Sequence, residues 1–418
     1  MKIIHLNYND SIGGAAKASS RIHKELLTFG IDSKFLTIDK YTQDIAVYAP
    51  INWLEKSMCI IIRKFNKLFL FLFYRNRKNA KFSVNLISIF SRLSINSMIK
   101  DSDLLNLYWV EDSLINFQIL KKIKKPIIWR LSDLAPMTGG CHFSNGCNKY
   151  VIACGKCPIL DSNQKYDLAF LQFYLKKKII DELDITIVAP SSWIAAEAAK
   201  SFLFKNKKIK TIYTGVDTNI FFPYDKINAR KHFNLDSSKK ILLFGAMSAV
   251  SDPRKGYNLL INSLNKLNFK DEEIELIIFG SKNLPALNKS FKIHMLGNIS
   301  DEYELRLAYN CADLFLCPSR EDNLPNTVLE AMACSVPVIA FDIGGLGDAV
   351  RHKKNGYLAN KYDCFDFANG IKWGLDELNN SGELKTNAIN LIKSEFNIKK
   401  QTSKFIKLFE EIINDRKK

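Results

Sequence analysis

Short apolar runs recur along the chain, and each run ends in a polar or glycine-bearing loop. An apolar run of four to eight residues bounded by such loops is typical of a buried strand. Strands that are covered on both faces by helices belong to parallel sheets. The expected strands are residues 2–7, 31–37, 103–109, 126–130, 185–190, 210–213, 239–246, 274–280, 294–297, 313–317 and 336–341.

These strands alternate with segments of helical periodicity, which predicts an α/β protein with two doubly wound, Rossmann-like halves. A chain of 418 residues is long enough for two domains. The N-terminal domain is expected to cover 1–210 and the C-terminal domain 211–395, with a linker around 205–222. The segment 396–418 is predicted to be an amphipathic helix with one buried face.

The stretch from Cys317 to Gly345 combines a strand, a carboxylate-bearing loop, a helix and a second strand. Ligands of open α/β sheets bind outside the carboxyl ends of the strands, so this loop is the first candidate site. Asn326 or Thr327 is expected to cap the helix, and the unpaired N–H groups of its first turn favour phosphate or sugar oxygens. The loop residues expected to face the ligand are Glu321, Asp322 and Asn323.

Three further loops carry candidate ligand groups. Gly13 and Gly14 follow an expected strand and let the backbone approach a ligand closely, although a simple turn explains a glycine pair equally well. Arg254 and Lys255 follow another expected strand, where two adjacent cations suit a diphosphate; a solvated basic turn is the alternative. Gly280 ends a strand where a nucleotide base is expected to rest.

Residues 319–334, S-R-E-D-N-L-P-N-T-V-L-E-A-M-A-C, resemble the donor-site signature of the retaining glycosyltransferases of family four, which have the GT-B fold. In that family two carboxylates eight positions apart contact the donor sugar and the nucleotide ribose, which implies these roles for Asp322 and Glu330. The family more often has glutamate at the first position. Thr327-x-x-Glu330 is also a capping box, so the alternative for Glu330 is a structural role. The resemblance extends the donor site to Asn323, Leu324, Pro325, Asn326 and Thr327.

The resemblance implies a hexosyltransferase of the kind acting in bacterial surface polysaccharide synthesis. It would take a sugar from a UDP- or GDP-linked donor and transfer it, with retention, to a glycan or lipid-linked acceptor. Lys255 matches the family's lysine at the leaving diphosphate, and no catalytic metal is expected. The family's arginine after the preceding strand is absent, because Ala246 lies there, and Arg254 is the expected substitute. The helix at 396–418 is expected to pack back toward the first domain, as in GT-B proteins.

Relatives in the resembled family usually have a histidine directly before the aspartate that aligns with Asp133, but this chain has Ser132 there. If that histidine touches the reacting sugar, this chain must use Asp133, His142 or backbone groups instead. Asp133 is therefore a candidate catalytic residue, with a loop-capping carboxylate as the alternative. Two other functions stay open: a sugar-nucleotide epimerase of the same fold, and a transferase-like binding or scaffold protein without turnover.

The net charge of +17 is concentrated between residues 56 and 100, where ten Lys and Arg side chains occur with no acidic residue. Aromatic and aliphatic residues interleave with these cations, a pattern typical of segments that lie on an anionic membrane surface. A nucleic-acid patch and a solvated helix pair with a buried apolar face are the alternatives. No nucleic-acid-binding motif is present, so nucleic acid is not an expected partner.

No run approaches the roughly 20 apolar residues of a membrane span. The start of the sequence lacks a signal-peptide pattern, so we expect a cytoplasmic protein, peripheral at the inner face of the plasma membrane. In that compartment cysteines are reduced or metal-bound.

Four of the nine cysteines lie within seventeen positions, in an insert at 137–160. The C-G-K-C sequence supplies the C-x-x-C turn in which two thiolates share one tetrahedral ion, whereas the first pair is spaced more widely than in common zinc knuckles. The sequence predicts a structural zinc site, with four buried free thiols as the alternative. The expected ligands are Cys141, Cys147, Cys154 and Cys157.

Overall fold

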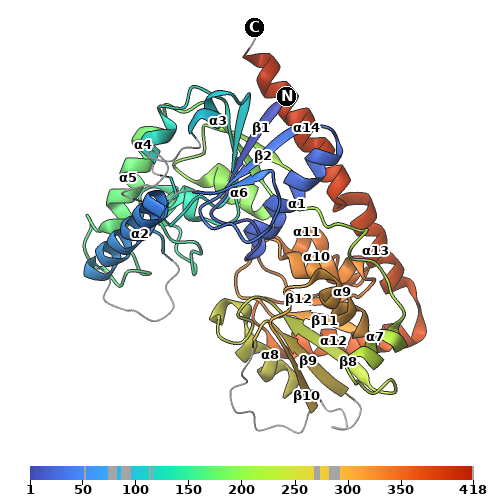
Figure 1. Cartoon of the computed structure of the whole chain (residues 1–418). Coiled ribbons are helices and arrows are strands. Elements are labelled where there is room, and N and C mark those ends of the chain that lie inside the picture. Colours follow the sequence, from blue (N-terminus) through green and yellow to red (C-terminus); the bar gives the residue numbers. More distant parts are fainter. Residues whose placement is uncertain are drawn as a thin grey trace. The chain divides into compact units, whose positions relative to one another are not determined.

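The computed structural model describes residues 1–50, 53–73, 82–85, 96–112, 114–115, 117–267, 274–281 and 292–416. The chain divides into two compact units, whose elements are labelled in Figure 1. Unit 1 consists of Met1–Tyr213 together with Gln401–Lys418, and unit 2 consists of Thr214–Lys400. Each unit is built on one open parallel sheet.

Seven parallel strands form the sheet of unit 1 in the order β3-β2-β1-β4-β5-β6-β7. The strand order reverses between β1 and β4, which is the topological switch point where ligands of such sheets bind. The strands are β1 (Lys2–Leu6), β2 (Asp32–Leu36), β3 (Val47–Tyr48), β4 (Leu104–Leu107), β5 (Ile127–Arg130), β6 (Ile185–Ala189) and β7 (Lys208–Thr211). The helices are α1 (Gly14–Thr28), α2 (Trp53–Phe73), α3 (Asn96–Lys100), α4 (Phe117–Leu120), α5 (Leu168–Ile180), α6 (Ser192–Lys200) and most of α14 (Ile398–Asp415).

The central strands β4 and β5 are buried along their whole length, as expected for apolar runs in a parallel sheet. Trp129 on β5 is fully buried, and its indole N–H donates to the carbonyl oxygen of Tyr108 at 3.1 Å. Trp109 and Asp133 follow these two strands in the sequence, so the core of unit 1 fixes both residues at the carboxyl edge of the sheet.

Six parallel strands form the sheet of unit 2 in the order β10-β9-β8-β11-β12-β13, with the switch point between β8 and β11. The strands are β8 (Lys240–Gly245), β9 (Ile274–Phe279), β10 (Lys292–Gly297), β11 (Leu314–Cys317), β12 (Val338–Phe341) and β13 (Gly356–Ala359). The helices are α7 (Lys226–His232), α8 (Tyr257–Leu264), α9 (Glu302–Cys311), α10 (Asn326–Ala333), α11 (Leu346–Ala349), α12 (Cys364–Asn380) and α13 (Glu383–Glu395).

The predicted pair of doubly wound halves is confirmed by these two sheets. Helix α12 contains Gly370 and Gly374, although glycine is unfavourable inside a helix. In the structure both glycines let α12 pack closely on the sheet. A Cβ atom at Gly374 would lie 3.1 Å from a methyl carbon of Leu314, and one at Gly370 would lie 2.5 Å from the Tyr357 ring.

The basic segment 56–100 is described only in part, as α2, the stretch 82–85 and α3. Five of its ten cations lie outside the described residues: Arg75, Arg77, Lys78, Lys81 and Arg92. Among the helices that the structure describes, none combines the length and the apolar character needed to cross a membrane.

Candidate functional site

The loop after β11 holds most of the residues predicted for donor binding. Gly344, which follows β12, has a φ of 55°, and a Cβ atom there would lie 1.8 Å from the carbonyl oxygen of Asp322. The N–H of Gly345 donates to the carbonyl oxygen of Asn323 at 2.7 Å. The backbone at 322–323 is therefore fixed by a close approach that only glycine at 344 allows.

Lys255 and Asp322 form an ion pair across the switch point of unit 2, because their loops follow β8 and β11. Lys255 Nζ lies 2.5 Å from Asp322 Oδ2, and the two side chains are 17% and 13% exposed. The Ser319 hydroxyl lies 3.5 Å from the same oxygen. Since a lysine ammonium is a point charge on a flexible stem, Lys255 can turn from this carboxylate to a phosphate without rearranging the backbone.

Arg254, the expected substitute for the family's arginine, pairs with a neighbour in its own loop. Its Nη2 and Nε atoms donate to the Asp252 carboxylate at 2.5 and 3.1 Å. Its carbonyl oxygen accepts from the N–H of Arg320 at 2.7 Å, which ties this loop to the loop after β11. The structure thus places Arg254 as a brace between the two loops, and its contact with a diphosphate stays a prediction.

Helix α10 begins at Asn326, and its cap residue is Pro325, which makes no side-chain cap. The expectation that Asn326 or Thr327 caps the helix is wrong, because both residues lie inside the first turn. Leu324 is buried at 7% exposure and anchors the loop before the helix. No cap side chain at Pro325 therefore competes with a ligand for the first-turn N–H groups.

Glu330 is buried inside α10 at 2% exposure, and its Oε2 atom accepts a hydrogen bond from the Tyr309 hydroxyl at 2.8 Å. The capping-box alternative is wrong, because the cap residue is Pro325 and Glu330 lies more than one turn further along the helix. A carboxylate is costly to bury without partners, so this position requires a specific reason. Donor binding, as the resemblance implies, would be such a reason.

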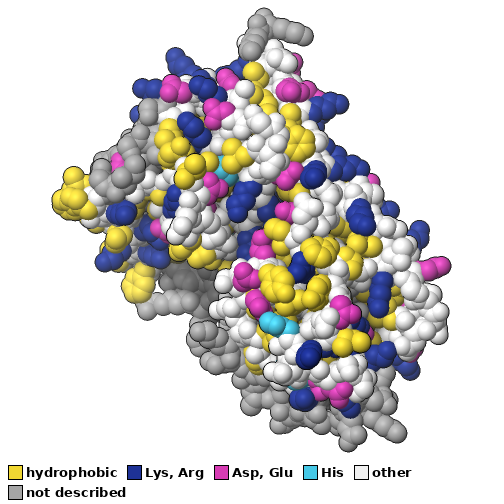
Figure 2. All heavy atoms as spheres, turned by 45° about the vertical axis from the view of Figure 1, so that its right-hand side comes forward, with side chains coloured by type: hydrophobic (Ala, Val, Ile, Leu, Met, Phe, Trp, Pro, Cys, Tyr) yellow, Lys and Arg dark blue, Asp and Glu magenta, His cyan; other side chains and the backbone are white. Residues whose placement is uncertain are grey.

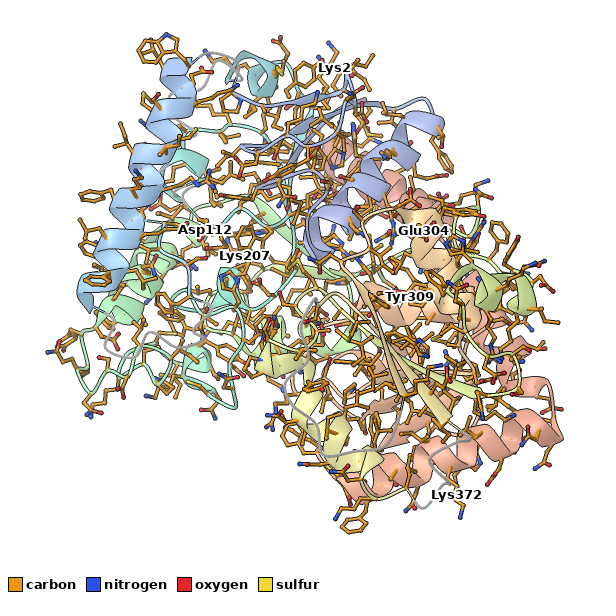
Figure 3. All side chains as sticks on the ribbon, turned by 60° about the horizontal axis from the view of Figure 1, so that its bottom comes forward. Lys2, Asp112, Lys207, Glu304, Tyr309 and Lys372 are labelled. Carbon is orange, nitrogen blue, oxygen red and sulfur yellow. The ribbon has the colours of Figure 1, made fainter. Side chains whose placement is uncertain are left out.

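Tyr309 is a residue of this site that sequence reasoning missed. It is fully buried on α9, inside unit 2 in Figure 3, and its ring packs edge-on against Phe221, Phe279 and Phe315. A buried tyrosine needs a partner for its hydroxyl group, and here the partner is Glu330. The signal in the sequence was a single tyrosine on the apolar face of the segment that forms α9.

Gly280 lies at the carboxyl end of β9 with a φ of 83°. A Cβ atom there would lie 1.7 Å from the carbonyl oxygen of Ala246, so packing between neighbouring strands already requires glycine. The N–H of Gly280 donates to the carbonyl oxygen of Gly297 at 2.6 Å. Contact of Gly280 with a nucleotide base stays a prediction.

Gly13 and Gly14 lie in unit 1, whereas the other residues predicted for donor binding lie in unit 2. Gly13 precedes α1 with a φ of 93° and makes no side-chain cap, and Gly14 is the first residue of the helix. Asn9 Oδ1 orders the loop by accepting from the N–H groups of Ser11 and Ile12 at 3.1 and 2.6 Å. The loop follows β1, at the switch point of unit 1.

Asp133 follows β5, and both of its carboxylate oxygens accept hydrogen bonds. Oδ1 accepts from the N–H of Ala135 at 2.9 Å, which is the loop-capping bond expected of the structural alternative. Oδ2 accepts from the indole N–H of Trp109 at 3.1 Å and lies 2.7 Å from His142 Nδ1. The structure thus joins Asp133 to His142, the two residues considered for the role of the missing histidine.

His142 lies at the centre of a buried network. Its Nε2 atom lies 2.8 Å from Ser83 Oγ, and the Ser83 hydroxyl donates to Asp112 Oδ1 at 3.2 Å; Asp112 is labelled in Figure 3. Burial alone would lower the pKa of His142, but the Asp133 carboxylate raises it above its ordinary value. Burial alone would raise the pKa of Asp133, but His142 lowers it. The network therefore favours the charged imidazolium–carboxylate pair.

Two further buried charged groups adjoin this network, and sequence reasoning missed both. Burial raises the pKa of the Glu111 carboxyl group and lowers the pKa of the Lys176 ammonium group. Lys176 Nζ donates to the carbonyl oxygens of Ala135 and Thr138 at 2.6 and 3.1 Å, so a side chain of α5 fixes the loop after Asp133.

The four cysteines predicted to bind zinc are free thiols. Cys141, Cys154 and Cys157 pack in one apolar cluster, and burial raises the pKa of Cys154 to about 12. Within the described residues, no group of three or more His, Cys, Asp or Glu side chains is arranged to hold a metal ion. Zinc binding stays a prediction: elemental analysis should find about one zinc per chain, lost when Cys154 and Cys157 are replaced by serine. Freely titratable thiols in a folded, metal-free protein would contradict it.

Comparison with known proteins finds a family match within unit 2. Residues 238–377 match the model of a family described as Glycosyl transferases group 1. D-inositol 3-phosphate glycosyltransferase 2 of Catenulispora acidiphila is 26% identical over 228 residues, which cover 51% of this chain and 52% of that protein. The chain spans about half to two thirds of the length of the curated relatives it matches.

Solved structures extend the similarity of fold to the whole chain. Sucrose-phosphate synthase from Thermosynechococcus elongatus has a TM-score of 0.67 and 17% identity, with 99% of both chains covered. Anabaena HepE in complex with UDP and glucose has a TM-score of 0.64 and 16% identity, with 98% of this chain and 100% of that chain covered. The predicted GT-B architecture is thereby confirmed. Together, the comparisons show a match to the group 1 glycosyltransferase family within residues 238–377 and the GT-B fold over both units.

Proposed function

We propose that this protein is a retaining hexosyltransferase that takes a sugar from a nucleotide diphosphate donor and transfers it to a glycan acceptor. The observation that carries the proposal is the Lys255–Asp322 ion pair, which lies across the switch point of unit 2. Buried Glu330 follows on α10. A neighbour of the same fold that was solved with UDP and with UDP-glucose makes uridine-linked sugars the first donors to test.

In the proposed reaction, Lys255 turns from Asp322 to the diphosphate, whose negative charge grows as its bond to the sugar breaks. The first-turn N–H groups of α10 donate to the same phosphate oxygens. Positive groups aimed at a developing charge lower the barrier, and this is the main catalytic contribution expected of unit 2. Asp322, released from Lys255, accepts from sugar hydroxyl groups, and Glu330 accepts from the ribose.

Retention follows when the acceptor hydroxyl group attacks on the face from which the diphosphate leaves. In this step the new glycosidic bond forms, the bond to the diphosphate breaks, and a leaving phosphate oxygen takes the proton of the acceptor. On the acceptor side, we assign Asp133 a positioning role, because its oxygens hold Trp109 and His142 at the carboxyl edge of unit 1.

A thermal-shift screen with UDP- and GDP-sugars tests donor binding, because a ligand of the folded state raises the melting temperature by mass action. We expect stabilisation by one nucleotide class and its loss in Glu330→Gln, which removes the charge and keeps the shape. Glu383→Gln on α13 is the matched control, since Glu383 is exposed. An E330Q enzyme with unchanged donor affinity and turnover would disprove the donor role.

The same preparation separates the two alternative functions. Incubation with the donor alone would yield an epimerised nucleotide sugar if the protein were an epimerase, whereas a transferase needs an acceptor for its product. A protein that binds the donor but gives no product with any acceptor would be the binding or scaffold protein.

Helix α2 supports a second proposal, attachment of unit 1 to an anionic membrane surface at the site of a lipid-linked acceptor. Figure 3 shows α2 at the edge of unit 1 with side chains projecting outward, and on the left of Figure 2 hydrophobic side chains lie beside Lys and Arg side chains. Apolar side chains with neighbouring cations suit an interface of this kind. The exposed apolar residues of α2 are Trp53, Leu54, Ile60, Ile61, Phe65, Leu68 and Phe71, and the exposed cations are Lys56, Lys64 and Lys67.

Vesicle co-sedimentation tests this attachment. Binding to anionic vesicles should weaken with added salt and with Lys64→Gln and Lys67→Gln, because screening and charge removal both reduce the attraction. Equal binding to neutral and anionic vesicles would contradict the electrostatic mechanism. If binding requires anionic vesicles, the protein acts in the cytoplasm, peripheral at the inner face of the plasma membrane.

A further inference from the structure

A hollow of about 750 Å³ lies in unit 1 between the loop after β2, strand β3 and helix α2. The α2 side of this β2–α2 hollow consists of residues spaced i, i+3, i+4 and i+7, which share one helix face. These residues are Lys56, Cys59, Ile60 and Arg63. The other side is formed by residues 38–42 and 47–50.

The charged groups that line the hollow leave an excess of positive charge: three are cations, Lys40, Lys56 and Arg63, and one is a carboxylate, Asp39. Lys40 Nζ donates to two backbone carbonyl oxygens, of Asp44 at 2.6 Å and Val47 at 2.9 Å, so its charge is held in place without a carboxylate. Arg63 pairs with Asp39 through a long contact of 3.3 Å. The hollow is therefore suited to an anion that carries about two charges.

Apart from Tyr41, Thr42 and Tyr48, which carry hydroxyl groups, the uncharged lining is apolar, and one of its residues also belongs to the outer face of α2. Ile38, Val47, Ala49 and Pro50 line the hollow together with Ile60. Ile60 is 51% exposed and lies on the same helix as the exposed apolar side chains described above. The hollow thus combines a cationic part with an apolar rim that continues onto the proposed membrane-facing surface.

We propose that the β2–α2 hollow binds the phosphate group of a membrane lipid, with the aliphatic part of the lipid passing over Ile60 onto the outer face of α2. A phosphate monoester has about −1.5 to −2 charges and three strong acceptor oxygens, which match the three cations better than the single charge of a diester. A soluble phosphate would satisfy the cations but would leave the apolar rim without a partner. The inference rests on the proposed membrane surface of α2 and makes no use of the donor site in unit 2.

The test compares two kinds of phosphatidylcholine vesicle at equal surface charge, one containing phosphatidic acid and the other phosphatidylglycerol. The hollow variant combines Lys56→Gln with Arg63→Gln. The matched control combines Lys64→Gln with Lys67→Gln, which removes the same charge from the same helix but from residues that do not line the hollow. The full-length protein is used throughout, and UDP-glucose thermal shifts check the donor site of unit 2 in each variant.

We expect the wild-type protein to prefer phosphatidic acid and the hollow variant to lose this preference. The control should lose about fivefold in affinity for each cation removed, on both lipids, and should keep the preference. Equal affinity of the wild type for the two vesicles, or equal loss of preference in both variants, would overturn the inference while leaving membrane attachment intact. A wild type that binds neither vesicle would overturn both.

Two further measurements keep the result decisive. Because Arg63 pairs with Asp39, Lys56→Gln alone is measured as well, and it should lose part of the preference without a change in melting temperature. Glycerol 3-phosphate and a short-chain phosphatidic acid are then compared as competitors. If glycerol 3-phosphate competes as strongly as the lipid, the apolar rim contributes nothing and the lipid assignment is wrong.

Discussion

Units 1 and 2 each carry a carboxylate in the loop after a central strand, Asp133 after β5 and Asp322 after β11, but the two have different partners. Asp322 meets the ammonium group of a flexible lysine, the backbone N–H of Asn323 and a distant hydroxyl group. Asp133 is held by a backbone N–H, an indole N–H and an imidazole that is itself bonded to Ser83. A carboxylate after a central strand thus belongs to a replaceable ion pair in unit 2 and to a fixed network in unit 1.

The two regions differ in how freely the partner of the carboxylate can move. A lysine can exchange a carboxylate for a ligand phosphate, whereas the ring of Trp109, stacked on His142 with centroids 5.5 Å apart, cannot leave without opening the loop. Substitutions in unit 2 should therefore affect turnover before stability, and substitutions in the network of unit 1 should affect stability first.

The largest expected effect is on turnover, at Lys255. Lys255→Ala removes the charge that stabilises the leaving diphosphate, and a loss of about 10²–10³ in turnover is expected, as for removal of one oxyanion donor. Stability should change by about 1 kcal/mol or less, as for a partly exposed ion pair. Steady-state kinetics and urea unfolding measure the two quantities, with exposed Lys372→Ala as the control. If K255A were unfolded at ordinary temperature, the expectation that substitutions in unit 2 affect turnover before stability would be wrong.

Asp133→Asn tests the other region. Removing one partner of a buried ion pair costs about 3–5 kcal/mol, because the remaining charge is left uncompensated. We expect this loss in the free energy of unfolding, measured by urea denaturation, while Asp161→Asn in an exposed position has little effect. A D133N protein that keeps its stability but loses turnover would show that Asp133 is a catalytic residue and that the two regions are alike.

The pH dependence of stability sharpens the comparison. The folded-state pKa of His142 is raised. Its contribution to the free energy of unfolding is therefore fully present below the unfolded pKa of about 6.5, and it is lost as pH rises through the folded-state pKa. The folded-state pKa of Asp133 is lowered, so its contribution is present above the unfolded pKa and is lost as pH falls through the folded value. Replacing His142 with glutamine should remove the alkaline decline, which thermal melts across pH would detect.

Tyr309→Phe carries the smallest expected effect. The change deletes one hydroxyl group that donates to Glu330 and leaves the aromatic packing in place, so a loss of about 0.5–1.5 kcal/mol is expected. If Glu330 holds the donor ribose, the variant should also bind the donor more weakly, since the carboxylate is less well oriented. Tyr303→Phe, at an exposed position of the same helix, is the control. Unchanged donor affinity in Y309F would exclude an orienting role.

The class of fold and the donor loop could be predicted because both depend on local sequence. Strand β11 is a continuous apolar run, β8 and β9 each contain only one charged residue, and the loop after β11 carries its chemistry within a few residues. The predicted start of α10 was wrong, because Pro325 occupies the cap position and has no capping side chain. A sequence pattern favours a side-chain cap when Asn and Thr stand nearby.

The partners of the site residues could not be predicted, because they come from distant parts of the chain. Ser83 and His142 are separated by 59 positions, and Tyr309 and Glu330 lie on different helices. Such pairs depend on how strands and helices pack, which periodicity does not encode. The same limit applies to Lys176, whose carbonyl partners lie about 40 positions earlier in the sequence.

Helix α14 links the fold to the order of protein synthesis. Its residues from Gln401 onward belong to unit 1. There Arg416 Nε donates to Asp184 Oδ2 at 3.0 Å. In the sequence, however, all of unit 2 lies between these residues and the rest of unit 1. On the ribosome, unit 2 is therefore fully made before Phe405, Leu408 and Phe409 exist to be buried. Domains generally fold as they emerge, so unit 2 can complete its core first, while unit 1, begun earlier, must wait for this helix.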